Sequence, residues 1–206
     1  MECNKRGLLI VLSGPSGVGK GTIRKAMFEK ENHNFSYSIS MTTRKPREGE
    51  VDGVDYYFVS KEEFLKRIEE GKFLEHAEFV GNYYGTPLDK VNEQLDLGKE
   101  VVLEIDVAGA MQVKKLVPDS VLIFILPPSK EALYERLKGR GTETEEVIKK
   151  RIETANKELL IAENYDYAVI NNTVDKAVDE IIEIINAEHS RVSRFLNNYL
   201  KSIKLK

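Results

Sequence analysis

Residues 8–20 read Leu8-Leu9-Ile10-Val11-Leu12-Ser13-Gly14-Pro15-Ser16-Gly17-Val18-Gly19-Lys20, and this stretch decides the fold. The five apolar residues at its start are typical of a strand buried on both faces, and Ser13-Gly14-Pro15 is a turn signal. The segment 22–31 then favours a helix. The order strand, glycine-rich loop, helix predicts that this stretch opens a parallel α/β sheet.

The rest of the chain repeats the alternation of strand and helix. We expect strands near residues 100–105, 121–126 and 167–170, and helices at 108–116, 130–138 and 145–164. Strands that alternate with helices indicate a parallel sheet covered by helices on both sides. The predicted fold class is therefore α/β, with a three-layer core built around a parallel sheet.

Residues 35–84 differ from this pattern, being rich in Ser, Thr, Tyr and Gly with short alternating segments. We interpret them as an antiparallel lobe inserted between the first two βα units. Ser60 begins a capping box for a helix that reaches Glu70, and Thr86 with Pro87 opens another that reaches Leu97. The expected organisation is a core of residues 1–34 and 87–206, an inserted mixed α/β lobe of 35–86, a helical lid near 137–157, and a tail of 189–206 after a unit of 7–188.

Composition excludes several classes of protein. The chain has 206 residues, 41% hydrophobic and 32% charged, which suffices for a buried core without disulfides. Its 31 Lys and Arg against 34 Asp and Glu leave a net charge of −3, so we expect no nucleic-acid partner and no stable membrane association. The single cysteine, Cys3, excludes a disulfide framework, and with no secretory signal pattern it favours a cytoplasmic location.

The glycine-rich turn satisfies the spacing G-x-x-x-x-G-K from Gly14 to Lys20. In that motif, known as the P-loop, backbone N–H groups surround phosphate oxygens, a helix N-terminus adds positive potential, and the lysine reaches the β and γ phosphates. The alternative is a glycine-rich turn with a solvent-exposed lysine. We expect an ATP phosphate site formed by Gly14, Pro15, Ser16, Gly17, Val18, Gly19, Lys20, Gly21 and Thr22.

Gly21 stands where the general motif has Ser or Thr, and the hydroxyl follows one residue later at Thr22. The residue after the lysine therefore cannot ligate magnesium directly. We expect Mg²⁺ to be held mainly by the nucleotide phosphates and by water, with a carboxylate elsewhere, and we assign no protein residue as a metal ligand.

A second cationic segment runs from Ser40 to Arg47. Arg44 and Arg47 are suited to bidentate contact with a phosphate, which a lysine cannot reproduce. An exposed cationic turn would explain the same residues, since charge clusters are usually solvated. Together with the P-loop, the segment indicates two phosphorylated ligands.

The chain resembles guanylate kinase in several separated motifs that occur in the right order, namely Gly14 to Lys20, Ser40 to Arg47, Asp55-Tyr56, Gly81 to Thr86 and Gly139 to Thr144. The resemblance runs from about Gly7 to Glu188. It implies that MgATP and GMP, and by extension dGMP, react to give ADP and a nucleoside diphosphate, on a core with a GMP-binding lobe and a mobile lid. It also implies that GMP is surrounded by Ser40, Arg44, Arg47, Tyr56, Glu75, Tyr84, Thr86 and Asp106.

These roles are chemically reasonable for guanine. The base presents N1–H and an exocyclic amine as adjacent donors, so ionised Glu75 can accept both, while the hydroxyls of Ser40 and Thr86 can donate to O6. Adenine cannot satisfy that pattern. Tyr83 and Tyr84 are adjacent, and we expect one of the two rings to have no role other than packing across the strands.

Two carboxylates follow a buried strand at Glu104 and Asp106. Ligands bind at this end of open parallel sheets, and strand alternation sends both side chains to the same side. Solvation at a strand end is the alternative. The resemblance favours Asp106 for GMP and leaves the role of Glu104 open between magnesium-bound water and the guanine edge.

Three arginines frame a flexible segment, and we favour Arg140 and Arg151 over Arg136 as catalytic residues beside Lys20 and Arg44. Arginines brought in by lid closure stabilise charge that spreads over a phosphoryl group in transfer. Surface ion pairing is the alternative for each. No general base is needed, because a phosphate monoester with a second pKa near ~6 is largely ionised at neutral pH.

Asn171 follows the last expected strand and resembles the family's adenine-side loop, although turn chemistry would explain it equally well. In the tail, apolar residues recur at helical spacing at Val192, Phe195, Leu196, Tyr199, Leu200 and Ile203. This stripe predicts packing on the protein's own core, a homo-oligomer contact through the C-terminal helix, or transient binding to an anionic surface, in that order.

Three other functions are alternatives to a GMP kinase, and the sequence argues against each of them. A kinase for another nucleoside monophosphate is disfavoured by Glu75, because AMP lacks the donors that it would accept. A non-catalytic interaction module of the same fold tends to lose the P-loop lysine, which is present here as Lys20. A regulatory nucleotide switch would not explain the second arginine site.

Overall fold

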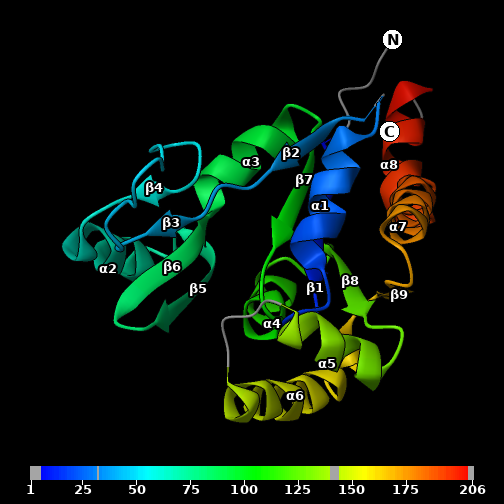
Figure 1. Ribbon diagram of the computed structural model, residues 1–206. Helices are drawn as coiled ribbons and strands as arrows, with labels where there is room; N and C mark the ends of the chain where they lie inside the picture. The colour runs from blue at the N-terminus through cyan, green and yellow to red at the C-terminus, as the bar shows by residue number, and fades with distance from the viewer. Residues whose placement is uncertain (1–5, 32, 140–143, 204–206) are drawn as a thin grey trace.

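The computed structural model describes residues 6–31, 33–139 and 144–203. Figure 1 shows a parallel sheet at the centre, a lobe to its left and a pair of helices below it. The core strands are β1 (Leu9–Ser13), β2 (Phe35–Tyr37), β7 (Glu100–Glu104), β8 (Val121–Leu126) and β9 (Tyr167–Ile170). The helices that cover this sheet are α1 (Lys20–Glu29), α3 (Leu88–Asp96), α4 (Val107–Leu116) and α7 (Val174–His189).

The central sheet is parallel throughout, with the strand order β2-β7-β1-β8-β9 among the described residues. Strand β1 lies in the middle, with Leu9 opposite Val101 of β7 and Ile10 opposite Val121 of β8. Every residue of β1 is buried, as its unbroken apolar run predicts. This position places the loop that follows β1 at the crossover point of the sheet, where open α/β folds bind ligands.

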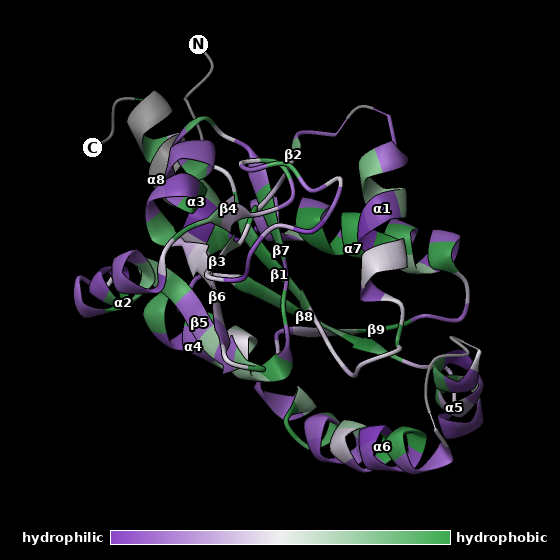
Figure 2. Cartoon of the chain, turned by 60° about the vertical axis from the view of Figure 1, so that its left-hand side comes forward, coloured by the Kyte–Doolittle hydropathy of each residue, from purple (hydrophilic) through white to green (hydrophobic). Residues whose placement is uncertain are grey.

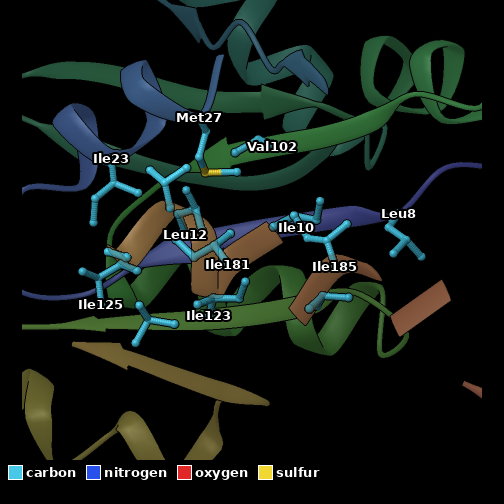
Figure 3. Close-up of a cluster of buried hydrophobic side chains, with 14 of the residues drawn as sticks. Leu8, Ile10, Leu12, Ile23, Met27, Val102, Ile123, Ile125, Ile181 and Ile185 are labelled. Carbon is cyan, nitrogen blue, oxygen red and sulfur yellow. The ribbon is translucent and has the colours of Figure 1, made fainter. Parts of the chain in front are cut away.

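Strand alternation divides the core into two hydrophobic clusters. Ile10 and Leu12 pack on one face with side chains of α1 and α7, as Figure 3 shows for Ile23, Met27, Ile181 and Ile185. Leu9 and Val11 point to the other face, where they meet side chains of α3 and α4. Figure 2 shows these strands as hydrophobic and the covering helices as mixed. The three-layer α/β core is confirmed.

The lobe contains a second sheet with the strand order β4-β3-β6-β5 among the described residues. Its strands are β3 (Met41–Thr42), β4 (Tyr57–Phe58), β5 (Phe73–Phe79) and β6 (Asn82–Pro87), and its helix is α2 (Lys61–Glu69). The expected antiparallel pairing holds for β3 with β6 and for β5 with β6, but β3 and β4 are parallel. Ser60 caps α2 by accepting from the Glu63 N–H, as its capping box predicts.

Two expected boundaries of the lobe are wrong by a few residues. Residues 35–37 form the edge strand of the core sheet, because Phe35 pairs with Glu100 and its ring packs against Phe28. At the other end, the lobe extends one residue further than expected, because β6 runs to Pro87 and Thr86 pairs with Glu75 across the ladder, while the helix expected from here to Leu97 is present. Helix α3 begins one residue after Pro87, which serves as its N-cap.

Helices α5 (Lys130–Lys138) and α6 (Glu145–Leu159) pack on each other below the core sheet in the view of Figure 1. Their contact is made by Leu133, Leu137, Ile148 and Ala155. The helix expected at 145–164 ends five residues early, and a separate 3-10 turn covers Ala162–Asn164. Its last turn tightens, with the Leu160 N–H donating to the Lys157 carbonyl, so the regular helix stops there.

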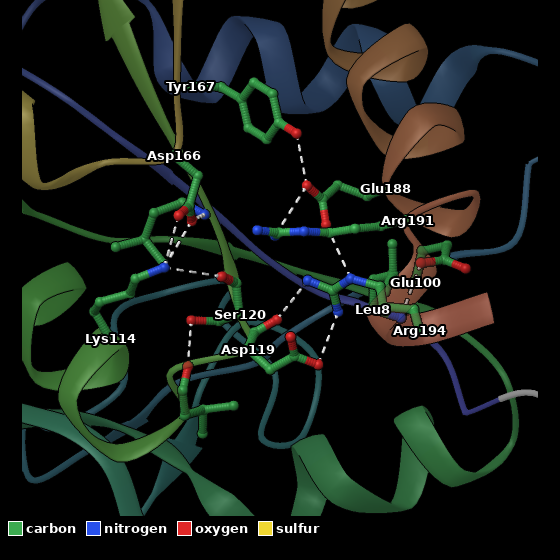
Figure 4. A network of polar contacts seen from close by, with 12 residues as sticks. Leu8, Glu100, Lys114, Asp119, Ser120, Asp166, Tyr167, Glu188, Arg191 and Arg194 are labelled. Carbon is green, nitrogen blue, oxygen red and sulfur yellow. Dashed lines mark hydrogen bonds and ion pairs between the residues drawn. The ribbon is translucent and has the colours of Figure 1, made fainter. Parts of the chain in front are cut away.

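The C-terminal helix α8 (Val192–Ser202) is held on its polar side. Arg194 donates to the carboxylates of Glu188 and Asp119, and the Glu188 carboxylate also accepts from Tyr167 (Figure 4). Most of the apolar stripe stays exposed, including Val192 at 68% and Phe195 at 43%. The stripe is therefore covered only in part by the rest of the chain, and the choice among its three expected contacts stays a prediction. No helix in the described ranges has the length and apolar character needed to cross a bilayer.

Candidate active site

The loop between β1 and α1 has the backbone shape that a phosphate cradle requires. Gly14, Gly17 and Gly19 all have positive φ, a conformation that residues with a side chain rarely adopt. Gly19 is also the N-cap of α1, and a Cβ there would lie 2.6 Å from Asn171 Nδ2. Among the other expected contact residues, Ser16 and Thr22 are exposed, whereas Pro15 and Val18 are buried.

Lys20 is the first residue of α1, and its ammonium folds back over the loop. Nζ donates to the carbonyl oxygens of Gly14 at 2.6 Å and Pro15 at 3.1 Å. These contacts hold the cation at the rim of the loop, beside the N–H groups at the helix start. The side chain therefore sits where a bound phosphate chain would meet both.

The loop is also supported from behind by two polar side chains. Arg136 donates to the carbonyl oxygens of Val18 at 3.0 Å and Asn171 at 2.9 Å, while Asn171 Nδ2 donates to the Val18 carbonyl at 2.8 Å. Asn171 is only 3% exposed. Arg136, the least favoured of the three arginines for a catalytic role, therefore fixes the backbone of the P-loop.

Glu104, whose role the sequence left open, ends β7 beside the start of α1. Its carboxylate accepts from Arg24 Nε at 2.9 Å, and the Arg24 guanidinium lies 4.3 Å from the ring centre of Tyr37. A Cβ on Gly21 would come within 3.2 Å of Glu104 Oε1. The glycine that replaces the usual Ser or Thr thus leaves room for a carboxylate.

The guanine side of the expected site is built on the strand pair β5 and β6. Glu75 and Thr86 face each other in the ladder and are both buried, and Thr86 Oγ1 donates to Glu75 Oε1 at 2.6 Å. The other Glu75 oxygen lies near Gly109 in α4, where a Cβ would be 3.1 Å away. Asp106 caps α4 by accepting from the Gly109 N–H at 2.7 Å. Three residues expected to surround GMP therefore converge here.

Burial changes the acidity of this group. It raises the pKa of Glu75 to about 7, with a smaller contribution from the neighbouring Asp106 carboxylate, while the bond from Thr86 acts in the opposite direction. Burial disfavours the ionised form of Glu75, so a ligand that donates two N–H hydrogen bonds to the carboxylate would stabilise that form. The electrostatics of the pocket therefore match a guanine edge better than an adenine edge.

The expected phosphate residues lie in the loop between β3 and β4. The Arg44 guanidinium forms a bidentate pair with Glu50 at 2.8 and 2.9 Å, and the backbone N–H of Arg47 donates to the same carboxylate at 2.7 Å. The Arg44 guanidinium holds the pKa of Glu50 at about 2. The Arg47 residue itself is exposed.

Two aromatic rings complete this side. The Tyr56 ring lies 6.2 Å from that of Tyr84 and 5.4 Å from the Arg44 guanidinium. The Tyr83 ring instead packs 5.6 Å from that of Phe64 of α2 in the hydrophobic cluster of the lobe, so it packs against a helix rather than across the strands. Ser40 lies between β2 and β3, and its carbonyl accepts from the Tyr57 N–H.

The lid is described only in part. Arg140 lies outside the described residues, and Arg151 is half-buried on α6. Glu158, on the same helix, is electrostatically coupled to Lys20 and to Asp106, and burial raises its pKa. The Lys20 ammonium partly offsets the effect of burial on the Glu158 carboxyl, and the Asp106 carboxylate adds to it.

Glu50, Arg24 and Glu158 were missed in the sequence as parts of the site. Glu50 offered a signal, since it follows the arginine segment by six residues from Arg44. The other two contact the site through strand order and helix packing, which no local pattern reveals. Among the described residues, no cluster of three or more His, Cys, Asp or Glu side chains could hold a metal ion.

Comparison with known proteins gives a consistent result. A family model described as guanylate kinase matches residues 6–188. The guanylate kinase of Enterococcus faecalis is 59% identical over 98% of this chain and 98% of its own length, and that of Onion yellows phytoplasma is 58% identical over 99% and 97%.

The chain belongs to the guanylate kinase family. The crystal structure of guanylate kinase from Anaplasma phagocytophilum is similar too, with 35% identity, a TM-score of 0.73, and coverage of 97% of this chain and 96% of that one. The match to the family model ends at Glu188, one residue before the end of α7, so it includes the P-loop and the lobe but not α8.

Proposed function

We propose that this chain is an ATP:GMP phosphotransferase that moves the γ-phosphoryl group of ATP to GMP in a reversible reaction of purine nucleotide metabolism. The observation that carries the proposal is the pairing of an intact P-loop, with Lys20 over its rim, and a buried Glu75–Thr86 pair. A non-catalytic module would have no use for the lysine.

Recognition of the acceptor base falls to the strand pair β5 and β6. Ionised Glu75 would accept from guanine N1–H and the exocyclic amine together. Ser40 and Thr86 are the proposed donors to O6, and the Thr86 hydroxyl would then have to turn from its bond to Glu75. Asp106 would border the same edge. None of these contacts addresses the sugar, so dGMP should also be accepted.

Arg44 and Arg47, with the hydroxyls of Tyr56 and Tyr84, would bind the GMP phosphate. On the other side, residues 14–22 would bind the phosphates of ATP, and Asn171 would border the adenine. Lys20, Arg44, Arg140 and Arg151 would neutralise the charge that spreads over the phosphoryl group during transfer. The attacking phosphate oxygen of GMP is already ionised at neutral pH, so no general base is required.

Magnesium fits the oxygen chemistry of this site. When bound with the nucleotide, Mg²⁺ would supply positive charge that offsets the negative charge of the phosphates. The phosphates and water would hold the ion, and the Glu104 carboxylate beside Gly21 would contact its water shell in place of the missing hydroxyl. The ion pair with Arg24 keeps this carboxylate at the start of α1.

For partners and location, we propose a cytoplasmic enzyme that binds no nucleic acid and has no stable membrane association. The exposed apolar residues of α8 support a contact between copies of the chain, because they lie beyond the site and stay exposed at 43–68%. Anionic surfaces remain the alternative partner. Measuring the mass in solution distinguishes a contact between copies from a monomer.

An acceptor panel tests the proposed activity. ADP formation from MgATP should be measured with GMP, dGMP, AMP, CMP and UMP at equal concentrations. Turnover with GMP and dGMP, and turnover with the other three that is at least about a hundredfold slower, is expected for a site built on polar complementarity. Equal turnover with AMP would refute the guanine assignment, and no turnover with any acceptor would refute the kinase.

A further inference from the structure

Glu50 occupies a defined part of the Arg44 guanidinium. Nη1 of Arg44 donates to the Lys45 carbonyl at 2.8 Å and to Glu50 Oε2 at 2.9 Å, and Nη2 donates to Glu50 Oε1 at 2.8 Å. The pair is largely shielded, with the two side chains 15% and 20% exposed. These bonds use three of the five N–H donors of the guanidinium.

The two donors outside these bonds lie on one edge of the guanidinium. They are the Nε–H and the second Nη2–H, which point in parallel and suit a bidentate anion. Tyr84 lies next to the guanidinium and contributes, after Glu50, to raising the pKa of Arg44. The ring of Tyr56 covers the group at 5.4 Å. Glu50 thus fixes one edge of Arg44 without using the Nε–H and the second Nη2–H, and the Tyr84 side chain also hydrogen-bonds to the guanidinium.

We propose that Glu50 is a positioning residue for the acceptor phosphate, holding Arg44 so that its Nε–Nη2 edge meets that phosphate beside Tyr84. The inference rests on the proposed function and deepens it. Glu50 also fixes the loop itself, because its Oε2 accepts from the Arg47 N–H at 2.7 Å. One carboxylate therefore orients both arginines of the second anion site, through the side chain of Arg44 and the backbone of Arg47.

By itself, the negative charge of Glu50 would weaken phosphate binding, since a carboxylate repels a phosphate. Whether Glu50 favours or disfavours phosphate binding therefore depends on Arg44. With Arg44 present, the carboxylate is neutralised by a bidentate pair and its net effect is to order a long side chain, whose free rotamers would otherwise be lost on binding. Without Arg44, the repulsion would remain beside the bond from the Arg47 N–H, which the amide oxygen of a glutamine at position 50 could also accept. Glu50→Gln should therefore weaken the use of GMP when Arg44 is present, and should not weaken it when Arg44 is absent.

A double-mutant cycle over Arg44→Ala and Glu50→Gln tests this reasoning. In the wild-type background, Glu50→Gln should raise the KM for GMP by about tenfold and leave the KM for ATP unchanged, because a charge-assisted pair is lost on the acceptor side only. In the Arg44→Ala background, Glu50→Gln should leave kcat/KM for GMP unchanged or raise it. Glu48→Gln, an exposed carboxylate in the same loop, is the matched control and should behave as wild type.

Thermal melting of each variant separates this outcome from a folding defect. An equal loss of kcat/KM from Glu50→Gln in both backgrounds would show a role in loop structure and overturn the proposal. A lower KM for GMP in the single variant would overturn it as well, since Glu50 would then compete with the phosphate. Failure of the proposed function is distinguishable, because the wild-type protein itself would not turn over GMP.

Discussion

Thr86 Oγ1 donates a 2.6 Å hydrogen bond to Glu75 Oε1 between two neighbouring strands of the lobe. The bond joins two buried side chains, 1% and 8% exposed, and so fixes one carboxylate oxygen at the place proposed for guanine. A buried carboxylate whose pKa is raised gains from further N–H donors, in addition to those of Thr86. Guanine supplies the two donors that it needs, and this need explains both the selectivity and the pH dependence expected of the site.

Binding of GMP should strengthen as the pH rises through 7. Burial raises the pKa of Glu75 to about 7, and only the ionised form accepts both guanine donors. We expect the KM for GMP to fall between pH 6 and pH 8, with a smaller change in the KM for ATP. The GMP phosphate also ionises near ~6, so Glu75→Gln is the control. A pH profile of KM that is equally steep in this variant would exclude Glu75 as the source.

Lys20→Met should lower kcat by orders of magnitude and leave the fold intact, since the ammonium would stabilise charge on the moving phosphoryl group. Nζ donates to carbonyls of the P-loop itself, so we expect any loss of stability to be confined to this loop. Single-turnover kinetics and melting check the two halves of this prediction. Near-normal turnover in the variant would remove Lys20 from the catalytic set.

Arg136→Met should act through the P-loop rather than through the acceptor. The variant leaves the carbonyls of Val18 and Asn171 without a charged donor, which loosens the loop backbone. We expect the Kd for ATP to rise by about tenfold, since a hydrogen bond from a charged group is worth about 1.5–3 kcal/mol. The affinity for GMP, measured separately by calorimetry, should stay within about twofold. A selective loss of GMP affinity would place Arg136 elsewhere.

The tail should matter for assembly more than for chemistry. Replacing the exposed Phe195 and Leu196 by Ser should lower the mass in solution, if copies meet through α8, with little effect on melting or on kcat. Arg194→Met is the matched variant, because it removes the bonds that anchor α8 and should lower the melting temperature. Loss of kcat with unchanged mass and melting would show that the tail serves the active site.

Much of the core could be predicted from the sequence because both faces of its strands are buried. A continuous apolar run such as residues 8–12 identifies such a strand without knowledge of its neighbours. The short edge strand at Phe35–Tyr37 carries no such run, so it was assigned to the lobe. The parallel pairing of β3 with β4 involves two residues in each strand, which is too short for any pattern of alternation.

The site was predictable where a local motif carries the chemistry, as in the P-loop from Gly14 to Lys20. It was not predictable where partners meet through topology. Arg136 reaches Val18 across 118 positions of sequence, and Glu104 reaches Arg24 across 80. Their contacts follow from which strand lies beside which, a property of the whole sheet.

The most direct test is the effect of Glu75→Gln on kcat/KM for GMP. The variant keeps the size of the side chain but replaces one acceptor oxygen by a donor, so one guanine N–H would face another N–H and a charge-assisted bond would be lost. We predict a cost of about 2–4 kcal/mol, or roughly 30- to 1000-fold in kcat/KM, with the KM for ATP almost unchanged. A value within about threefold of wild type would contradict the assignment and make Asp106 the next candidate for reading the base.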